Sequence, residues 1–301
     1  MNHFLELISK PDNVPIVGLL FLIVFYTWLA YSKAIKNDSQ EIPEEAKQDD
    51  KVQVWPNLVR VEFLAMLAVF IILAVWSILI DAPLEQSANP ALTPNPSKAP
   101  WYFLGLQELL VYFDPWIAGV ILPTIIIVGL MAIPYIDINP KGNGYYTFKE
   151  RKFAILTFSF GFLILWIALI ILGTFLRGPG WNFFLPWEIW DAHKVVVLNN
   201  LDLSEYFGIP TVNSDNTLNI FASIFGFLVV AIFYVGFGLW HYTKIKSTEF
   251  FKKLGPTRYW TTSFLFWTMM FVVLKIFLRL LPPVFGGYPV KYIWVTPWFN
   301  I

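Results

Sequence analysis

Residues 153–176 read FAILTFSFGFLILWIALIILGTFL, a run that contains no charged side chain. A helix needs about 20 mostly apolar residues to cross the roughly 30 Å hydrocarbon core of a bilayer, so this run predicts a transmembrane helix. Similar runs predict five further spans, at about residues 14–32, 61–80, 116–136, 218–241 and 260–281. The predicted fold class is therefore all-α, an integral membrane helical protein with about six transmembrane helices.

The composition of the 301-residue chain supports this class. Only 14% of its residues are charged, whereas a soluble domain carries about 25%. The net charge is zero, so nothing favours nucleic acid as a partner. The chain has no cysteine, which excludes disulfides, cysteine-ligated iron–sulfur clusters and covalently attached haem. No basic leader precedes the first span, which we interpret as a retained helix rather than a signal peptide.

Basic residues are unevenly distributed between the segments that connect the spans. Most of the 21 Lys and Arg residues follow the first, third and fifth spans: Lys33, Lys36, Lys47, Lys51 and Arg60; Lys141, Lys149, Arg151 and Lys152; Lys244, Lys246, Lys252, Lys253 and Arg258. Cytoplasmic loops carry such an excess. We therefore expect these segments on the cytoplasmic side and both termini on the outer, electropositive side. Residues 1–54 would form an extra transmembrane helix and a charged cytoplasmic linker.

A polar, proline-rich stretch separates the second and third spans. Residues 88–105 read ANPALTPNPSKAPWYFLG. A proline-stiffened loop that runs into Trp101, Tyr102 and Phe103 at a membrane surface can form one wall of a quinone pocket. Aromatic residues also gather at membrane interfaces without binding a ligand, so an ordinary aromatic belt is the alternative interpretation.

Several short motifs, in this order, resemble the C-terminal half of cytochrome b. The quinol-oxidation loop of that family is similar to Asn89-Pro90, Thr93-Pro94, Lys98 and Trp101-Tyr102-Phe103. The start of subunit IV of the plastoquinol-oxidising complexes is similar to Trp55-Pro56-Asn57. The family's next helix and its exit are similar to Gly119-Val120, Gly129-Leu130 and Ile133-Pro134-Tyr135-Ile136-Asp137. The resemblance covers about residues 55–177, a core of three helices with a quinol-site loop at 81–113.

The resemblance implies a role in a larger complex. Such a subunit pairs with a haem-carrying N-terminal half of cytochrome b, a Rieske-type iron–sulfur protein and a c-type cytochrome. Together they act as a cytochrome bc-type quinol:cytochrome oxidoreductase, which oxidises quinol on the outer side and translocates protons. We expect a quinone of the menaquinone type, a cell inner (energy-transducing) membrane, and no activity of this chain alone.

The b haems and the iron–sulfur cluster are expected in the partner subunits. Haems b need pairs of histidines on facing helices inside the membrane. The histidines of this chain are His3, His193 and His241, in a terminus, an outer loop and a helix end. None of them is placed to form such a pair, which agrees with a subunit that does not ligate haem.

The sequence departs from the family at the residue that accepts a proton from quinol. The family's loop reads Pro-Glu-Trp-Tyr, whereas this chain reads Ala99-Pro100-Trp101-Tyr102. We expect Pro100, Trp101, Tyr102 and Phe103 to contact the quinone, with Glu108 as the substitute general base. Glu108 lies two helical turns after Trp101, on about the same face, in an apolar setting that would raise its pKa. The alternative is a Glu at the headgroups, solvated or bonded to a partner subunit.

Arg60 and Glu62 stand at the cytoplasmic start of the second span. In the family a second quinone site lies near this end, so both are candidates for inner-side quinone binding or proton uptake. Charges at a membrane entry also often only reach the interface, which is the alternative here. Asp114, which precedes Pro115, is expected to cap the third span.

The rest of the chain lies outside the family core. Residues 178–217 form an aromatic outer loop, and we predict no metal site although Glu188, Asp191 and His193 are close in sequence. Residues 218–301 supply two extra transmembrane helices and a C-terminal tail. Lys275 and Arg279, near the outer end of the last span, would either pair with a neighbouring subunit or extend to the headgroups.

Two other functions remain alternatives to the quinol:cytochrome oxidoreductase subunit. One is a quinone-binding membrane anchor of another respiratory redox complex, which the missing loop glutamate favours. The other is a transporter. Two observations count against a transporter: the spans carry few polar residues near their middle, and the sequence shows no visible internal repeat.

Overall fold

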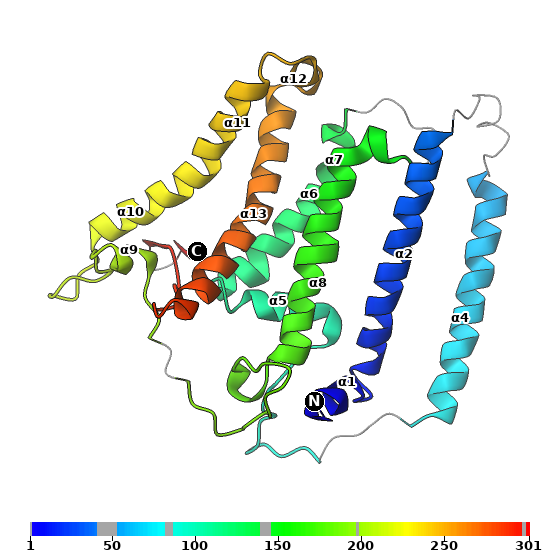
Figure 1. Ribbon diagram of the computed structural model, residues 1–301, viewed down its shortest axis with the longest axis horizontal. Coiled ribbons are helices and arrows are strands. Elements are labelled where there is room, and N and C mark those ends of the chain that lie inside the picture. The colour runs from blue at the N-terminus through cyan, green and yellow to red at the C-terminus, as the bar shows by residue number, and fades with distance from the viewer. Residues whose placement is uncertain (1, 41–52, 82–86, 139–145, 197–198, 297–298) are drawn as a thin grey trace. The chain divides into compact units, whose positions relative to one another are not determined.

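A computed structural model describes residues 2–40, 53–81, 87–138, 146–196, 199–296 and 299–301 (Figure 1). Among these residues, six helices are long and apolar enough to cross a membrane: Val14–Ser39, Val54–Leu79, Ile117–Ile136, Phe148–Leu176, Ile220–Ile245 and Pro256–Pro283. They confirm the all-α fold class and the six predicted spans. The charged linker at 41–52, with Lys47 and Lys51, and also Lys141 lie outside the described residues.

The elements follow one another along the chain, and π-helical turns (η1–η4 and η6) interrupt several of the spans. They are α1 (Asn2–Ile8), α2 (Val14–Ser39), η1 (Val54–Leu58), α4 (Val59–Leu79), α5 (Trp101–Leu109), η2 (Ile117–Ile121), α6 (Leu122–Ile136), α7 (Phe148–Phe158), η3 (Ser159–Trp166), α8 (Ile167–Ile171), η4 (Leu172–Leu176), the 3₁₀ turn η5 (Pro179–Trp181), α9 (Leu203–Tyr206), α10 (Ile220–Ala231), η6 (Ile232–Gly236), α11 (Phe237–Ile245), α12 (Glu249–Leu254), α13 (Pro256–Val284), β1 (Trp294–Thr296) and β2 (Phe299–Asn300).

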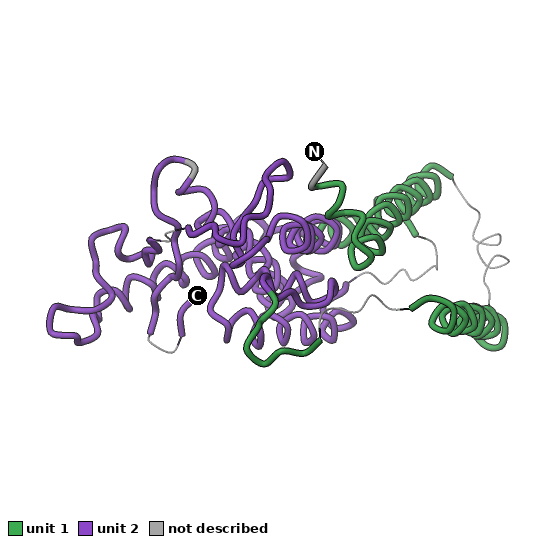
Figure 2. The backbone as a smooth tube through the Cα atoms, turned by 90° about the horizontal axis from the view of Figure 1, so that it is seen from below, with its two compact units in different colours: residues 1–94, 141–157 green, residues 95–140, 158–301 purple. Residues whose placement is uncertain are grey.

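The chain divides into two compact units (Figure 2). Unit 1 comprises residues 1–94 and 141–157, and unit 2 comprises residues 95–140 and 158–301. The division into 1–54, 55–177, 178–217 and 218–301 was drawn from the family resemblance, and it stays a prediction.

In unit 1, the end of α2 is tied to the start of α7. A carboxylate oxygen of Asp38 accepts hydrogen bonds from the main-chain nitrogens of Phe148 and Lys149, at 3.1 and 3.0 Å. The amide of Asn37 donates to the main-chain oxygen of Tyr146 at 3.0 Å. A carboxylate at a helix N-terminus satisfies free N–H groups and opposes the positive end of the helix dipole. The extra first span therefore contacts the start of the fourth.

The helix α4 has no buried residue. Its exposed side chains are almost all apolar, with Glu62 in the first turn. Inside a bilayer such side chains need no protein neighbour, because hydrocarbon solvates them and the helix satisfies its own backbone groups. The surface of α4 is thus suited to lipid or to the apolar helices of another subunit.

Unit 2 has a core at one end of its helices, where the short helix α5 meets the third, fourth and sixth spans and the C-terminal tail. Its buried side chains are Leu109, Tyr112, Phe113, Ile117, Ala118, Leu122, Leu169, Phe271, Val272, Ile293 and Ile301. Along the spans, α6 packs on α13, and a β-carbon at Gly129 would lie 3.2 Å from the side chain of Leu265. The sixth span, which lies outside the family resemblance, therefore packs directly on a span inside it.

The C-terminal tail is bound by the last span and by the outer loop. Lys275 is only 1% exposed, and its ammonium donates to the main-chain oxygens of Ile301 at 2.8 Å and Lys291 at 3.1 Å. Arg279 donates to the side-chain oxygen of Asn200 at 2.7 Å. Of the two alternatives for Lys275, extension to the headgroups is therefore wrong, because its ammonium is buried and binds main-chain carbonyl oxygens.

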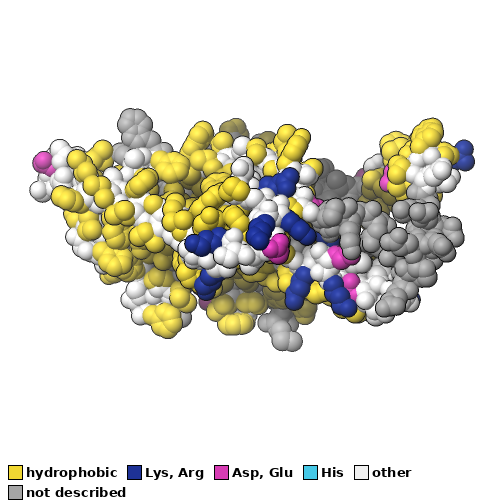
Figure 3. All heavy atoms as spheres, turned by 90° about the horizontal axis from the view of Figure 1, so that it is seen from above, with side chains coloured by type: hydrophobic (Ala, Val, Ile, Leu, Met, Phe, Trp, Pro, Cys, Tyr) yellow, Lys and Arg dark blue, Asp and Glu magenta, His cyan; other side chains and the backbone are white. Residues whose placement is uncertain are grey.

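The opposite end of the helix pair α11–α13 carries a basic face. Lys244, Lys246, Lys252, Lys253 and Arg258 are all exposed there. A view onto the face where α12 lies shows basic side chains gathered among hydrophobic ones (Figure 3). The fifth and sixth spans thus carry their excess of basic residues at the α12 end, as the topology prediction requires, although the side of the membrane itself stays a prediction.

Candidate functional site

The segment that leads into α5, residues 95–100, is held at three points; we call it the strap. The side-chain oxygen of Asn95 accepts a hydrogen bond from the main-chain nitrogen of Gly180 at 2.6 Å. The ammonium of Lys98 donates to the main-chain oxygen of Thr174 at 2.7 Å and lies 4.7 Å from the ring centre of Trp190. The side chain of Gln107 binds the main chain of the strap. The strap is therefore fixed both to the end of the fourth span and to α5.

The helix α5 begins where a proline ends the strap. Pro100 has φ −51° and ψ 149°, an extended conformation that directs the chain into the helix at Trp101. The buried face of α5 consists of Leu104, Gly105, Glu108 and Leu109, which recur at helical spacing. Gly105 allows close packing, because a β-carbon there would lie 3.0 Å from the indole of Trp166. The packing of α5 against the fourth span therefore fixes which residues of α5 face outward.

The predicted quinone-contacting residues lie on the exposed first turn of α5. Trp101, Tyr102 and Phe103 are 39%, 52% and 52% exposed. Their rings contact one another in sequence: the centroids of Trp101 and Tyr102 are 5.8 Å apart and those of Tyr102 and Phe103 are 4.7 Å apart. Apolar ring faces and the Tyr102 hydroxyl are thus available to a ligand or to a neighbouring subunit.

Glu108 lies on the buried face of α5, in an ion pair with Arg177. Its carboxylate has no exposed surface, and Arg177 binds it side-on, with Nη2 to Oε1 at 2.7 Å and Nε to Oε2 at 3.0 Å. The hydroxyl of Tyr112 donates to Oε1 at 2.8 Å. Such two-point, charge-assisted contacts are among the strongest hydrogen bonds in proteins. The environment expected to be apolar is therefore a polar network inside an apolar shell.

The surroundings of Arg177 and Tyr112, the partners of Glu108, keep the guanidinium charged and the phenol protonated. Burial alone would lower the pKa of Arg177, but the hydrogen bonds and negative charge of Glu108 outweigh burial and raise it. Burial, with the charge of Glu108, also raises the pKa of Tyr112. The guanidinium thus stays charged and the phenol stays a hydrogen-bond donor at any physiological pH.

This geometry sets a condition on Glu108 as a general base. If the carboxylate took up a proton, the positive charge of Arg177 would remain buried without its counter-ion, which is costly. The proton would also have to reach a group without exposed surface, through Tyr112 or past a parted ion pair. The role of Glu108 as proton acceptor stays a prediction, and the arrangement equally suits a carboxylate that fixes Arg177.

Sequence reasoning missed Arg177, although one signal was available. Arg177 directly follows the uncharged run at 153–176, and a cation in that position requires a counter-ion or water. Its guanidinium also donates to the main-chain oxygen of Trp181 at 3.2 Å, which closes the turn after the fourth span. The ion pair therefore joins α5 to the first residues of the outer loop.

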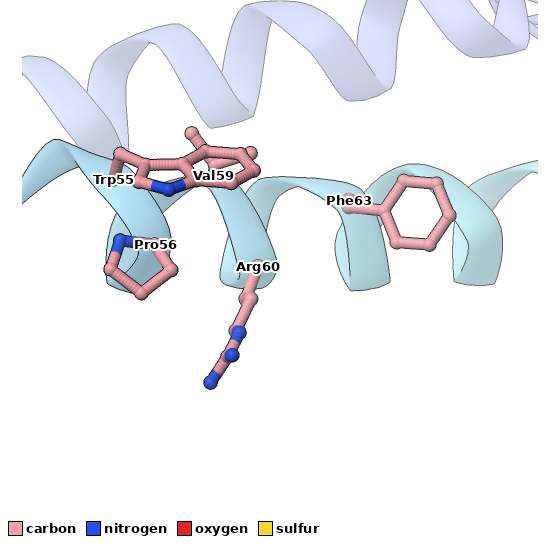
Figure 4. Close-up of a pocket in the computed structure, with 5 residues that line it drawn as sticks. All are labelled: Trp55, Pro56, Val59, Arg60 and Phe63. Atoms are coloured by element: carbon pink, nitrogen blue, oxygen red, sulfur yellow. The ribbon is translucent and has the colours of Figure 1, made fainter.

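The second candidate site, at the start of the second span, is a shallow hollow of about 280 Å³ (Figure 4). It is lined by Trp55, Pro56, Val59, Arg60 and Phe63, which all lie on one helical stretch. Arg60 belongs to the hollow, whereas Glu62 is exposed outside it. A hollow formed by one helix encloses no ligand by itself, so a binding site here would need a second wall from lipid or a partner. The roles of Arg60 and Glu62 stay predictions.

Two other acidic residues singled out in the sequence, Asp114 and Glu188, have structural contacts. Asp114 accepts a hydrogen bond from the main-chain nitrogen of Trp116 at 3.0 Å, and its main-chain oxygen accepts from Ala118 at 3.0 Å, which confirms it as the cap of the third span. Glu188 accepts from the main-chain nitrogen of Leu185 and lies 3.7 Å from the ammonium of Lys194. Within the described ranges, no three His, Cys, Asp or Glu side chains are grouped to hold a metal ion.

The six apolar spans define a multi-pass membrane protein. Its candidate site lies at the end of the helices, where the proline-rich strap leads into the exposed aromatic turn. Residues 87–177 match the family described as cytochrome b (C-terminal)/b6/petD. The match confirms the family resemblance for the strap, α5 and the third and fourth spans. No solved structure matches the chain.

The match fixes the broad class of activity. The chain is a multi-pass integral membrane protein of an energy-transducing membrane and takes part in electron transport. The family indicates a subunit of a bc-type redox complex that works beside an N-terminal half of cytochrome b. The first, second, fifth and sixth spans lie outside the matched residues.

Proposed function

We propose that this chain is the non-haem-ligating membrane subunit of a quinol:cytochrome c-type oxidoreductase, and that it forms part of the outer-side quinol-oxidation pocket. The observation that carries the proposal is the exposed aromatic turn Trp101–Phe103, which directly follows a fixed strap inside the family match. Quinol loses two electrons and two protons to become quinone. A Rieske-type cluster and haem b, held by the partner subunits, would accept the electrons, and the protons would leave on the outer side.

This chain's residues would bind and orient the quinol. The rings of Trp101 and Phe103 offer apolar faces for packing against the quinone ring. The Tyr102 hydroxyl can donate to a quinone carbonyl or accept from a quinol hydroxyl. The buried network of Glu108, Arg177 and Tyr112 lies behind this turn and holds α5 in place, with Glu108 as the candidate proton acceptor. Arg60 and Glu62 are proposed for an inner-side quinone or proton-uptake site.

The partners provide the test. We expect the chain, purified in mild detergent, to carry with it a four-helix cytochrome b rich in histidine, a Rieske-type protein and a c-type cytochrome. The purified assembly should reduce cytochrome c with a menaquinol analogue as donor. Purification of the chain as a solitary, haem-free oligomer would contradict the proposal and favour a transporter.

One observation favours a second function, a quinone-binding anchor of another respiratory complex. The family's loop glutamate is replaced by Pro100, and the candidate substitute, Glu108, is already paired with Arg177. A pocket without a free proton acceptor can bind quinone yet oxidise quinol poorly. Co-purification of a molybdenum-containing or other catalytic subunit, with no Rieske-type protein, would identify this function.

A further inference from the structure

The side chain of Gln107 turns back along α5 and binds the end of the strap. Its carbonyl oxygen accepts a hydrogen bond from the main-chain nitrogen of Ala99 at 2.8 Å. Its amide nitrogen donates to the main-chain oxygen of Ser97 at 2.9 Å. Both ends of one amide group are thus used, so neither can be lost without loosening the strap. Gln107 therefore ties the main chain at residues 97 and 99 to α5.

The contact to Ala99 depends on a departure from the family pattern. In the pattern Pro-Glu-Trp-Tyr, the position of Ala99 is a proline, which has no N–H group to donate. Here the proline stands one residue later, at Pro100, and residue 99 carries a free N–H that Gln107 accepts. The change that removes the loop glutamate therefore also creates the donor for Gln107.

We propose that Gln107 is a positioning residue of the quinol site, which sets the orientation of Trp101, Tyr102 and Phe103 by holding the strap to α5. This inference rests on the proposed function. Gln107 itself faces the strap and need not touch the quinol. Its effect is transmitted through Ala99 and Pro100, the two residues that lead directly into the aromatic turn.

The geometry explains why a second attachment of the strap matters. Asn95 and Lys98 fix the strap to the end of the fourth span and to the outer loop, at Gly180, Thr174 and Trp190. Gln107 supplies hydrogen bonds from α5 to the main chain at 97 and 99, and without them the strap would be held less firmly to α5. With a loosened strap, the rings of Trp101 and Phe103 would have to be ordered when the quinol binds, and this cost should weaken quinol binding.

The test uses Gln107→Met in the assembled complex, with activity expressed per haem. Methionine keeps the length of the side chain but forms neither hydrogen bond. We expect the KM for the quinol to rise about fivefold, with a smaller change in kcat, because the aromatic side chains would have to be ordered on binding. A variant that merely destabilised the fold would lower the yield of complex and leave the KM of the surviving molecules unchanged. Gln107→Glu keeps the acceptor for Ala99 and should give an intermediate KM.

A second readout follows the strap itself. The chain has no cysteine, so Ser97→Cys introduces a single site for a spin label in this subunit, on an exposed side chain. We expect the label to become more mobile with Gln107→Met. The matched control is Gln40→Met, the same chemical change at an exposed position beyond the end of α2, which should change neither KM nor label mobility.

The outcomes separate this inference from the proposed function. An unaltered KM and an unaltered label in Gln107→Met, in a complex whose wild type oxidises quinol, would overturn the role of Gln107 alone. A wild-type complex that oxidises no quinol would overturn the proposed function and this inference with it. A raised KM together with a mobile label supports both.

Discussion

A buried charge decides how Glu108 can act at the site. The Glu108 carboxylate has no exposed surface and is bound by Arg177 at two points. Removing one partner of a buried pair leaves the other charge without compensation. The pair therefore connects catalysis and stability at one residue, and the two contributions have to be measured separately.

The stability contribution is tested with Arg177→Met. We expect this change to lower the free energy of unfolding by about 3 kcal/mol, because Glu108 would stay buried without its counter-ion. Thermal unfolding of the purified complex in mild detergent measures the loss. The double variant Glu108→Gln/Arg177→Met leaves no charge unpaired and should be more stable than Arg177→Met alone. Equal stability of the wild type, Arg177→Met and the double variant would show that the ion pair does not form.

The catalytic contribution is tested with the same variants. If Glu108 accepts the proton of quinol, Glu108→Gln should slow quinol oxidation by about tenfold or more and alter its pH profile. The double variant should then remain slow. If Glu108 serves only to neutralise Arg177, the double variant should recover turnover relative to the single ones. Unchanged turnover in Glu108→Gln would remove this residue from the mechanism.

The residue-scale contacts show where sequence reasoning ends. Glu108 was found because a carboxylate near the loop is chemically required, and Asp114 because a cap follows a local rule. Arg177 was missed as the partner of Glu108, since the two residues are 69 positions apart and nothing in the sequence brings them together. Gln107 was missed because its contact depends on how the strap folds back over α5.

At the scale of elements, the spans were predictable and their packing was not. An apolar run long enough to cross a membrane is a local property, and all six predicted runs are helical. The docking of the C-terminal tail is a tertiary property. The tail lies along α10 and α9, and β1 pairs with β2 at its end. Lys275, for which the sequence left either a neighbouring subunit or the headgroups as partner, instead binds this tail.

The close approach of α10 to β1 gives a prediction at this scale. A β-carbon at Gly226 would collide with the main-chain oxygen of Trp294. We expect Gly226→Ala to displace the tail and lower stability by about 2 kcal/mol, detected as faster proteolysis of the residues after α13. Gly236→Ala, in the same span, is the control, because its added carbon would lie 3.5 Å from the nearest atom, a side-chain carbon of Ile232. Equal proteolysis of both variants would contradict this packing.

At the scale of the whole molecule, the orientation in the membrane can be tested directly. The chain lacks cysteine, so single cysteines can report the side of the membrane. We predict that Thr93→Cys reacts with a membrane-impermeant maleimide added from the outer side, and that Ser247→Cys reacts only from the cytoplasmic side. Both positions are exposed. The reverse pattern would place the strap on the wrong side for quinol oxidation.

The central claim is that the strap and the first turn of α5 form a wall of the quinol-oxidation pocket. The most direct measurement is photolabelling of the assembled complex with a photoreactive menaquinone analogue, followed by mass spectrometry of the labelled peptides. We predict that label on this chain is concentrated in residues 95–109, including Trp101, Tyr102 or Phe103, and is displaced by excess quinol. Label confined to other segments of this chain or to its partners, with none in 95–109, would contradict the claim.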